Sequence, residues 1–225
     1  MNDQTPQIVL GIDASTRNVS IALGGTGIQP RMRCWESTRG KPGRLPIEIA
    51  TLMEEAGVEW EQIARIGVGT GPGMYAGLRV SVTLAQALAL PTRIPVVGVN
   101  SAQSLLTTMM PDYQDAPAIW VCGDARRDHI WLYTCDTGAS ACMATERLVP
   151  LAALARETAI SGTRLISPDY SRLGTRIPLP AGVTWVPQDQ FPRADAVIML
   201  AKYTNPVQSP PAIHYIHPAV SGTCR

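Results

Sequence analysis

A glycine-rich turn between two different hydrophobic patterns constrains the fold of this chain most strongly. It spans residues 70–79 and reads TGPGMYAGLR. Residues 66–69 before it form a short apolar run typical of a buried strand, and residues 78–90 after it show helical periodicity. The turn therefore joins the carboxyl end of a strand to the amino end of a helix, where unpaired amide groups attract anions.

The turn matches neither of the two standard phosphate-binding loops. A P-loop has Lys and then Ser or Thr after its last glycine, whereas Leu78 and Arg79 follow Gly77 here. The dinucleotide fingerprint G-x-G-x-x-G is one residue shorter between its second and third glycines than this run. An alternative that needs no ligand is that Gly71 and Gly73 permit a tight turn and Gly77 permits close helix packing.

The composition indicates a globular chain without a strong electrostatic field. The 225 residues are 45% hydrophobic, and 19 Lys and Arg nearly balance 18 Asp and Glu. We therefore expect no direct binding of nucleic acid. Residues 1–7 lack the layout of a signal peptide, and no run approaches the roughly 20 apolar residues of a membrane span. These features predict a cytoplasmic protein that does not bind membranes.

The cysteines and histidines predict no metal site. The five cysteines are scattered without a C-x-x-C pair, which predicts reduced thiols rather than a disulfide framework or a zinc site. They are Cys34, Cys122, Cys135, Cys142 and Cys224. His214 and His217 fall in a segment expected to be extended, where residues three apart point to opposite faces. A metal shared by these two histidines is therefore not expected.

Strand-like and helix-like segments follow one another in both halves of the chain. In the first half we expect strands over residues 8–12, 19–23, 66–69 and 94–99, and helices over 45–56, 78–90 and from Asn100 or Ser101 to Met109. In the second half we expect strands over 119–122, 130–133, 164–166 and 183–186, and helices over 151–157 and 193–203. The proline-rich tail after Asn205 is expected to be irregular.

The two halves begin with a similar hairpin. Asp13 and Ala14 follow the first strand, and Asp124 and Ala125 stand at the same place about 110 residues later. This weak repeat suggests a duplicated unit. We divide the chain into an N-terminal part, 1–105, and a C-terminal part, 106–225.

The helix after the turn has apolar residues on two faces. One face comprises Leu78, Val82, Ala85 and Ala89, and the other comprises Val80, Leu84, Ala87 and Leu88. A sheet buries only one face of a helix, so the second face requires another helix of this chain or a second protein. The residues leave both alternatives open.

Together these residues resemble the bacterial TsaB (YeaZ) family. The resemblance rests on the hairpin around Asp13, the turn at 71–79 with its helix, the strand at 94–99 and the run at 123–127, in that order. It implies an α/β fold: the duplicated ribonuclease H-like fold of the actin-like ATPase superfamily, with two mixed sheets flanked by helices. It also implies a role in threonylcarbamoyladenosine modification of tRNAs that read ANN codons, as the non-catalytic partner and activator of TsaD.

The resemblance further implies a set of partners and contact residues. TsaD would form a heterodimer with this chain, TsaE is a further candidate partner, and the chain alone would form a homodimer. Candidate interface residues are Tyr75, Val80, Leu84, Ala87 and Leu88. Candidate nucleotide contacts are Asp13, Ser15 and Thr16 in the hairpin and Gly71 and Gly73 in the turn. No catalytic residue, metal or tightly bound cofactor is expected, and ATP with magnesium would bind at the joint with the partner.

Two departures from the family pattern bear on these expectations. Family turns commonly read GPGSFTGLR, and here Met74, Tyr75 and Ala76 stand in the middle, so that two hydroxyls are lost and an aromatic ring is kept. The segment before the tail usually ends in Tyr-Leu-Arg, whereas residues 215–217 read Tyr-Ile-His. The turn is therefore better suited to contact a protein than to hold ATP.

A second hypothesis is an independent ATP-dependent phosphotransferase of the sugar-kinase-like superfamily. Asp13 would then lie at the phosphate hairpin and Asp124 at its counterpart, holding magnesium through water. The competing interpretation is that each aspartate accepts hydrogen bonds from the amides of its own turn. A third hypothesis, a metalloprotease, lacks the necessary cluster of ligands.

Overall fold

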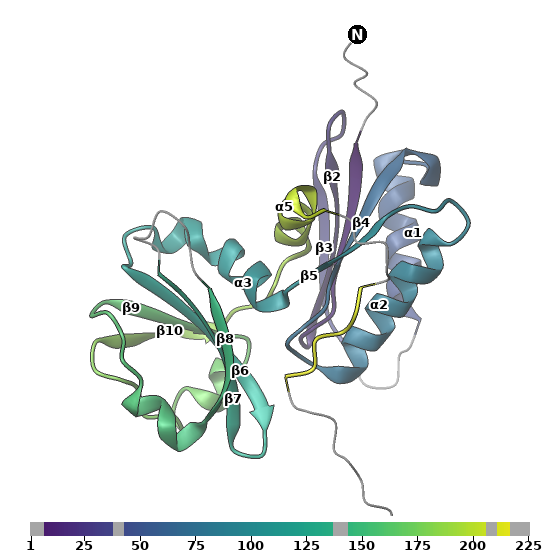
Figure 1. Cartoon of the computed structure of the whole chain (residues 1–225). Coiled ribbons are helices and arrows are strands. Elements are labelled where there is room, and N and C mark those ends of the chain that lie inside the picture. Colours follow the sequence, from purple (N-terminus) through teal and green to yellow (C-terminus); the bar gives the residue numbers. More distant parts are fainter. Residues whose placement is uncertain (1–6, 38–42, 137–143, 206–210, 217–225) are drawn as a thin grey trace, which may run out of the picture. The chain divides into compact units, whose positions relative to one another are not determined.

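The computed structural model describes residues 7–37, 43–136, 144–205 and 211–216, which form two compact units (Figure 1). The first unit consists of the described residues within Met1–Asp112 and Gln190–Ile213. The second consists of those within Tyr113–Asp189 and His214–Arg225. The sequence-based division at residue 105 stays a prediction. Helix α5 (Ala194–Tyr203) follows the second unit in the chain but belongs to the first.

A five-stranded mixed sheet forms the centre of the first unit. Its strands are β1 (Ile8–Asp13), β2 (Asn18–Gly25), β3 (Arg31–Glu36), β4 (Ile63–Gly69) and β5 (Val96–Val99), in the spatial order β3-β2-β1-β4-β5. Strand β1 pairs antiparallel with β2 and parallel with β4, which pairs parallel with β5. The carboxyl ends of β1, β4 and β5 therefore meet at one edge of the sheet.

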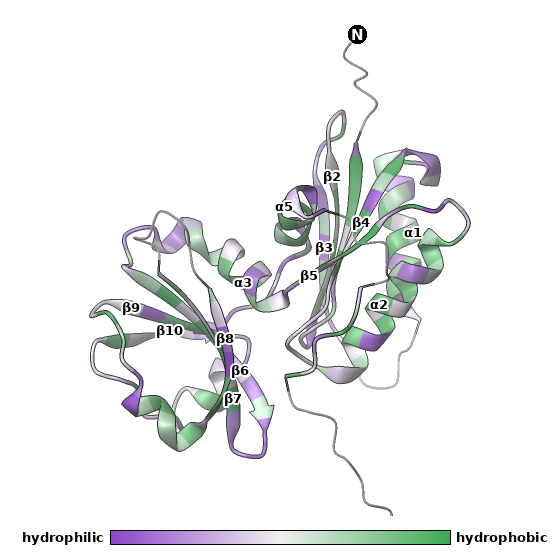
Figure 2. Cartoon of the chain, in the orientation of Figure 1, coloured by the Kyte–Doolittle hydropathy of each residue, from purple (hydrophilic) through white to green (hydrophobic). Residues whose placement is uncertain are grey.

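Helices cover both faces of this sheet, which explains why hydrophobic residues dominate β1 and β4 (Figure 2). Helices α1 (Arg44–Ala56) and α2 (Tyr75–Ala89) pack on the face that carries Leu10. Helix α5 packs on the other face. A Cβ at Gly11 would lie 2.4 Å from the backbone oxygen of Ala194, so only glycine admits α5 this close to the sheet.

Three shorter helical segments complete the first unit and its connection to the second. They are α3 (Ser101–Met109) and the 3-10 turns η1 (Trp60–Gln62) and η2 (Met110–Tyr113). The described part of the tail has no helix or strand, as predicted. It returns to the first unit at Pro211, whose carbonyl accepts a hydrogen bond from Gln86 Nε2 at 3.4 Å, and Ile213 packs against the core.

The second unit repeats the strand order of the first. Its strands are β6 (Ala118–Arg126), β7 (His129–Asp136), β8 (Thr145–Pro150), β9 (Thr163–Ser167) and β10 (Val183–Asp189), in the order β10-β9-β6-β7-β8. The antiparallel and parallel pairings correspond strand for strand to those of the first sheet. A 3-10 segment, η3 (Leu151–Arg156), and one short helix, α4 (Tyr170–Leu173), flank the strands. The predicted duplicated α/β architecture with two mixed sheets is confirmed.

The sequence prediction missed the third strand of each sheet, β3 and β8, and the short helix α4. Among the strands that the structure describes, β3 pairs with β2 alone. Most of its residues are exposed, so its sequence lacks an apolar stripe. The short helix predicted over 151–157 is a 3-10 helix, η3, over Leu151–Arg156. These are elements whose local sequence carries little periodicity.

The prediction of reduced cysteines is correct for Cys34 and Cys122 but wrong for Cys135, which is disulfide-bonded. The absence of a C-x-x-C pair did not exclude this bond, because a disulfide requires two cysteines that are close in space, which their spacing in the sequence does not determine. Cys142, Cys224 and His217 lie outside the described residues. His214 Nε2 lies 2.6 Å from Glu146 Oε1. Within the described ranges, no helix is both long enough and apolar enough to cross a membrane.

Candidate functional site

Asp13, at the carboxyl end of β1, is the centre of a buried hydrogen-bond network. The residue is 0% exposed. Its Oδ1 accepts hydrogen bonds from the Ser15 N–H at 2.9 Å and the Ser15 Oγ at 2.6 Å, and its Oδ2 accepts one from Ser101 Oγ at 2.9 Å. Burial raises the pKa of the Asp13 carboxyl, and these hydrogen bonds oppose the rise. The carboxylate thus joins the β1–β2 hairpin to α3.

Ser101 connects this aspartate to the glycine-rich turn. Its Oγ accepts the Gly71 N–H at 3.2 Å, and its own N–H donates to the Gly71 carbonyl at 2.8 Å. The cap of α3 is Asn100, whose Oδ1 accepts the Gln103 N–H at 3.0 Å. The sequence identified Ser101 only as a possible cap. The signal for its second role was the parallel order of β1, β4 and β5, which brings their carboxyl ends together.

Gly73 and Gly77 let the turn and α2 lie directly against the β1–β2 hairpin. The Met74 N–H donates to the Ser15 carbonyl at 2.6 Å. A Cβ would lie 2.2 Å from the Ser15 carbonyl oxygen at Gly73, and 2.0 Å from the Ala14 carbonyl oxygen at Gly77. Neither distance can accommodate a side chain without moving backbone. Gly77 therefore permits close helix packing, as the alternative without a ligand supposed, and Gly73 permits the same close approach of the turn to the hairpin.

The candidate nucleotide contacts in the first unit belong to one network. Asp13, Ser15 and Gly71 are joined through the hydrogen bonds described above, and Gly73 packs on Ser15. Thr16 Oγ1 donates to the carbonyl of Asn18 at 2.9 Å and accepts its N–H at 3.2 Å, so Thr16 serves the same hairpin. Ser15 is 1% exposed and Thr16 is 8% exposed. A contact between these residues and a nucleotide stays a prediction.

Asp124 occupies the corresponding place in the second unit, in the β6–β7 hairpin. Its Oδ1 accepts the Arg126 N–H at 2.7 Å, and its Oδ2 accepts a hydrogen bond from Arg172 Nη1 at 3.0 Å. Its N–H donates to Asp169 Oδ2 at 2.9 Å. Like Asp13, it accepts the amide two residues further along, as the competing interpretation of the two aspartates supposed. No group of three or more His, Cys, Asp or Glu in the described ranges is placed to hold a metal ion.

The first apolar face of helix α2 is buried, whereas the second face has both half-buried and exposed residues. Leu78, Val82, Ala85 and Ala89 are all buried, as predicted. On the second face, Leu84 and Leu88 are half-buried and pack against the core of the first unit. Val80 is 56% exposed and Ala87 is also exposed. The chain's own packing therefore accounts for half of the second face.

The amino end of α2 presents an aromatic ring together with a guanidinium group. Tyr75 is 54% exposed, and the Arg79 guanidinium carbon lies 4.5 Å from the centre of its ring, in range of a cation–π interaction. Exposed residues continue along the helix and just beyond its end. We call these exposed residues the α2 strip; it comprises Val80, Ala87 and Leu90 on one side of the helix and its end, and Met74 and Tyr75 at the amino end.

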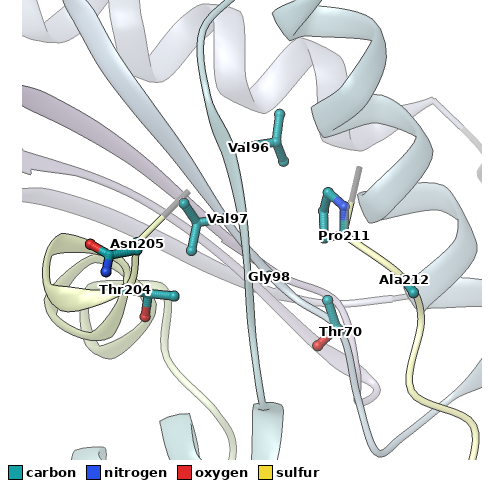
Figure 3. A pocket seen from close by; sticks show the side chains of 8 residues that line it. All are labelled: Thr70, Val96, Val97, Gly98, Thr204, Asn205, Pro211 and Ala212. Carbon is teal, nitrogen blue, oxygen red and sulfur yellow. The ribbon is translucent and has the colours of Figure 1, made fainter. Parts of the chain in front are cut away.

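A hollow of about 230 Å³ lies beside the edge strand β5 (Figure 3). It is lined by Thr70, Val96, Val97, Gly98, Thr204, Asn205, Pro211 and Ala212. In Figure 3, β5 passes between the end of α5 and the tail segment that lies alongside α2. The lining carries no charged side chain, and the volume is below the roughly 300–1,000 Å³ of typical ligand pockets. We assign no chemistry to this hollow.

Comparisons with known proteins point to one biosynthetic system. Residues 26–155, more than half of the chain, match the family described as TsaD: tRNA N6-adenosine threonylcarbamoyltransferase. A tRNA N6-adenosine threonylcarbamoyltransferase of Clostridium novyi is 34% identical over 78 residues, which are 35% of this chain and 23% of that protein. The tRNA threonylcarbamoyladenosine biosynthesis protein TsaB of Escherichia coli is 28% identical over 104 residues, with 43% of this chain and 42% of that protein covered. The chain thus spans less than half the length of these relatives.

A solved structure extends the likeness to most of the chain. YeaZ from Pseudomonas aeruginosa matches with a TM-score of 0.74 at 22% identity, covering 88% of this chain and 91% of that chain. This match confirms the predicted duplicated fold. Together with the TsaB match, it confirms the resemblance to the TsaB (YeaZ) family that the sequence indicates.

Proposed function

Because this chain belongs to the family described as TsaD, tRNA N6-adenosine threonylcarbamoyltransferase, we propose that it acts in the threonylcarbamoyladenosine modification of tRNA. Its part is that of a non-catalytic partner and activator of a TsaD subunit, for tRNAs that read ANN codons. The relatives named for this reaction and for this pathway support the assignment. The role in the complex is carried by the α2 strip.

The α2 strip has the form of a docking surface for a partner helix. Val80 and Leu90 are 56% and 77% exposed, although both are large apolar residues. Exposed apolar residues that recur along one side of a helix are the usual anchors of helix-mediated contacts. We propose that TsaD docks on this strip and that a second copy of this chain occupies it when TsaD is absent. TsaE is a further candidate partner, and ATP with magnesium would bind at the joint.

The contacts of the two hairpin aspartates support a non-catalytic part. A phosphotransferase needs carboxylates that face its metal ion. Asp13 is fully buried with both oxygens engaged by Ser15 and Ser101. Asp124 accepts hydrogen bonds from Arg126 and Arg172. These contacts favour the partner role over the independent phosphotransferase.

Val80→Glu tests the proposed interface. A charge placed in the middle of an apolar contact is desolvated without a partner and typically costs several kcal/mol, on the order of a hundredfold or more in affinity. We therefore expect Val80→Glu to fold normally, to lose co-purification with TsaD, and to lower the threonylcarbamoyladenosine content of tRNA. Because Leu84 packs partly against the core, a charge there would also disturb folding, and Val80 is the cleaner site.

Met199→Glu is the matched control for this test. Met199 is also 56% exposed and also lies on a helix of the first unit, but α5 covers the opposite face of the sheet. This variant should still co-purify with TsaD. If Val80→Glu binds TsaD as well as the wild type does, the proposal that the α2 strip forms the interface is wrong. Turnover of magnesium-ATP by the isolated chain would instead support the phosphotransferase.

A further inference from the structure

The hairpin between β6 and β7 ends in a backbone conformation that residues with side chains rarely adopt. Arg126, Arg127 and Asp128 have φ values of 69°, 52° and 57°. Since Arg126 pairs with His129 across the hairpin, Arg127 and Asp128 are the central residues of a tight left-handed turn. Such positions usually hold Asn or Gly, because a Cβ is strained there.

Hydrogen bonds from neighbouring elements hold this tip in place. The Arg126 N–H donates to Asp124 Oδ1 at 2.7 Å, and the Leu151 N–H donates to the Asp128 carbonyl at 2.8 Å. His129 Nδ1 also lies 2.7 Å from the Arg127 carbonyl oxygen. Main-chain groups, Asp124 and His129 thus hold the conformation, and these hydrogen bonds involve no arginine side chain. Glycine would fit the same backbone with less strain. The main-chain conformation therefore gives no reason for arginine at these two positions.

Both arginine side chains of the tip are exposed to solvent. Arg126 is 77% exposed, and its nearest carboxylate oxygen, on Asp124, is 3.7 Å away. That oxygen is closer to Arg172, at 3.0 Å. Arg127 is exposed and forms no ion pair within the part of the chain that the structure describes. Asp124, Asp128 and Asp169 balance the charges of Arg126, Arg127 and Arg172 in this part of the unit. The tip therefore presents two exposed, adjacent guanidinium groups without a net positive charge.

We propose that Arg126 and Arg127 contact phosphate groups of the RNA backbone when this chain is assembled with its partner. The inference rests on the proposed function, which supplies an RNA substrate. Guanidinium groups are well matched to phosphate, and strain that is retained at exposed positions is typical of functional sites. The balance of 19 basic and 18 acidic residues means that the chain alone does not capture RNA. The hairpin adds contacts to an RNA that the complex already holds.

The test uses the complex of this chain with TsaD and a fluorescently labelled transcript of a tRNA that reads ANN codons. Binding is measured by fluorescence anisotropy over a series of salt concentrations. Arg127→Gly removes one guanidinium and relieves the strained turn, so the isolated variant should unfold at a urea concentration no lower than the wild type. Its complex should nevertheless bind the tRNA more weakly. The plot of log affinity against log salt concentration has a negative slope. The magnitude of this slope should decrease by about 0.7–0.9 for each phosphate that the variant no longer neutralises.

Arg93→Gly is the matched control, because Arg93 is a second exposed arginine with a positive φ, 56°, and lies in the first unit. It removes the same charge and the same strain, and should leave the affinity for tRNA unchanged. Arg127→Lys keeps the charge and should retain most of the salt dependence.

Three results would overturn the proposal. The first is equal affinity and equal salt slope for the wild type, Arg127→Gly and Arg93→Gly. The second is loss of the TsaD complex in Arg127→Gly, which would place the arginine in a protein contact instead. In both cases the proposed function stands. If the wild-type chain forms no complex with TsaD, or the complex binds no tRNA, the proposed function fails and this inference fails with it.

Discussion

Replacing Gly77 by alanine tests whether the glycine-rich turn is shaped by packing inside this chain. Gly77 is the third residue of α2, where alanine normally favours the helix by about 1 kcal/mol. The added Cβ would lie 2.0 Å from the Ala14 carbonyl oxygen and 3.2 Å from its carbonyl carbon. Because real Cβ atoms essentially never approach closer than 3.0 Å, α2 or the hairpin must move by about 1 Å.

The steric cost of this movement exceeds the gain in helix propensity. Extra atoms in a packed contact typically cost about 1–3 kcal/mol. The movement would also stretch the 2.6 Å hydrogen bond from the Met74 N–H to the Ser15 carbonyl, which contributes about 1 kcal/mol. After the propensity gain of about 1 kcal/mol, we expect Gly77→Ala to lower the free energy of unfolding by about 1–3 kcal/mol.

Urea denaturation followed by circular dichroism measures this difference. The control is Gly24→Ala, because a Cβ at Gly24 would meet Ile198 at an ordinary contact distance of 3.5 Å. Its unfolding midpoint should stay close to that of the wild type. If Gly77→Ala proves as stable as the wild type, the close approach of α2 to Ala14 is refuted. A stable variant that no longer co-purifies with TsaD would mean that the glycine serves the partner.

Two further substitutions test the network and the packing of α5. Burial raises the folded-state pKa of Asp13 above its ordinary value of 3.8, so the folded protein binds this proton more tightly than the unfolded chain, and stability is lost as pH rises through the folded pKa. The stability of Asp13→Asn relative to the wild type, measured by urea midpoints, should therefore increase as pH rises above the ordinary value of 3.8, and a decrease would contradict the reasoning. Arg65 on β4 donates hydrogen bonds to the carbonyls of Ala201, Lys202 and Thr204 at the end of α5. Arg65→Met should therefore lower the free energy of unfolding by about 1–3 kcal/mol. Hydrogen exchange of the amides in the last turn of α5 should become faster. Arg65→Lys should recover part of this loss; equal exchange in all three proteins would show that the cap is unimportant.

The inner strands of the fold could be predicted because buried strands consist of consecutive apolar residues, a pattern that is visible in the local sequence. Residues 8–12 and 66–69 are buried and covered on both faces, so they read as continuous apolar runs. Strand β3 could not be recognised in this way, because an edge strand has exposed positions such as Arg31 and Cys34. The helical pattern predicted α5 but could not say which sheet it covers. That information lies in the glycines at positions 11 and 67, whose role is visible only once the helix is in place.

The candidate site was predictable as a set of residues but not as a set of contacts. Asp13, Ser15 and Gly71 were predicted as candidate nucleotide contacts, in segments where polar residues and glycines follow buried strands. The structure brings all three together. Ser101 completes the network, yet nothing in its own surroundings in the sequence indicates this. Its position depends on the parallel pairing of β5 with β4, which no local pattern determines.

Helix geometry explains why the residues on the second apolar face of α2 differ in exposure. Successive residues of a helix are rotated by about 100°, so Val80 and Ala87 lie almost opposite the centre of the buried face, whereas Leu88 and then Leu84 lie nearer its flank. The observed exposure follows this order, with Leu84 and Leu88 half-buried and the other two exposed. Only the far side of the helix, and not the whole second face, is left exposed to solvent by the packing of this chain. For this reason, a charge substituted at Val80 tests the proposed partner contact alone. A charge substituted at Leu84 would also disturb the core, against which Leu84 packs.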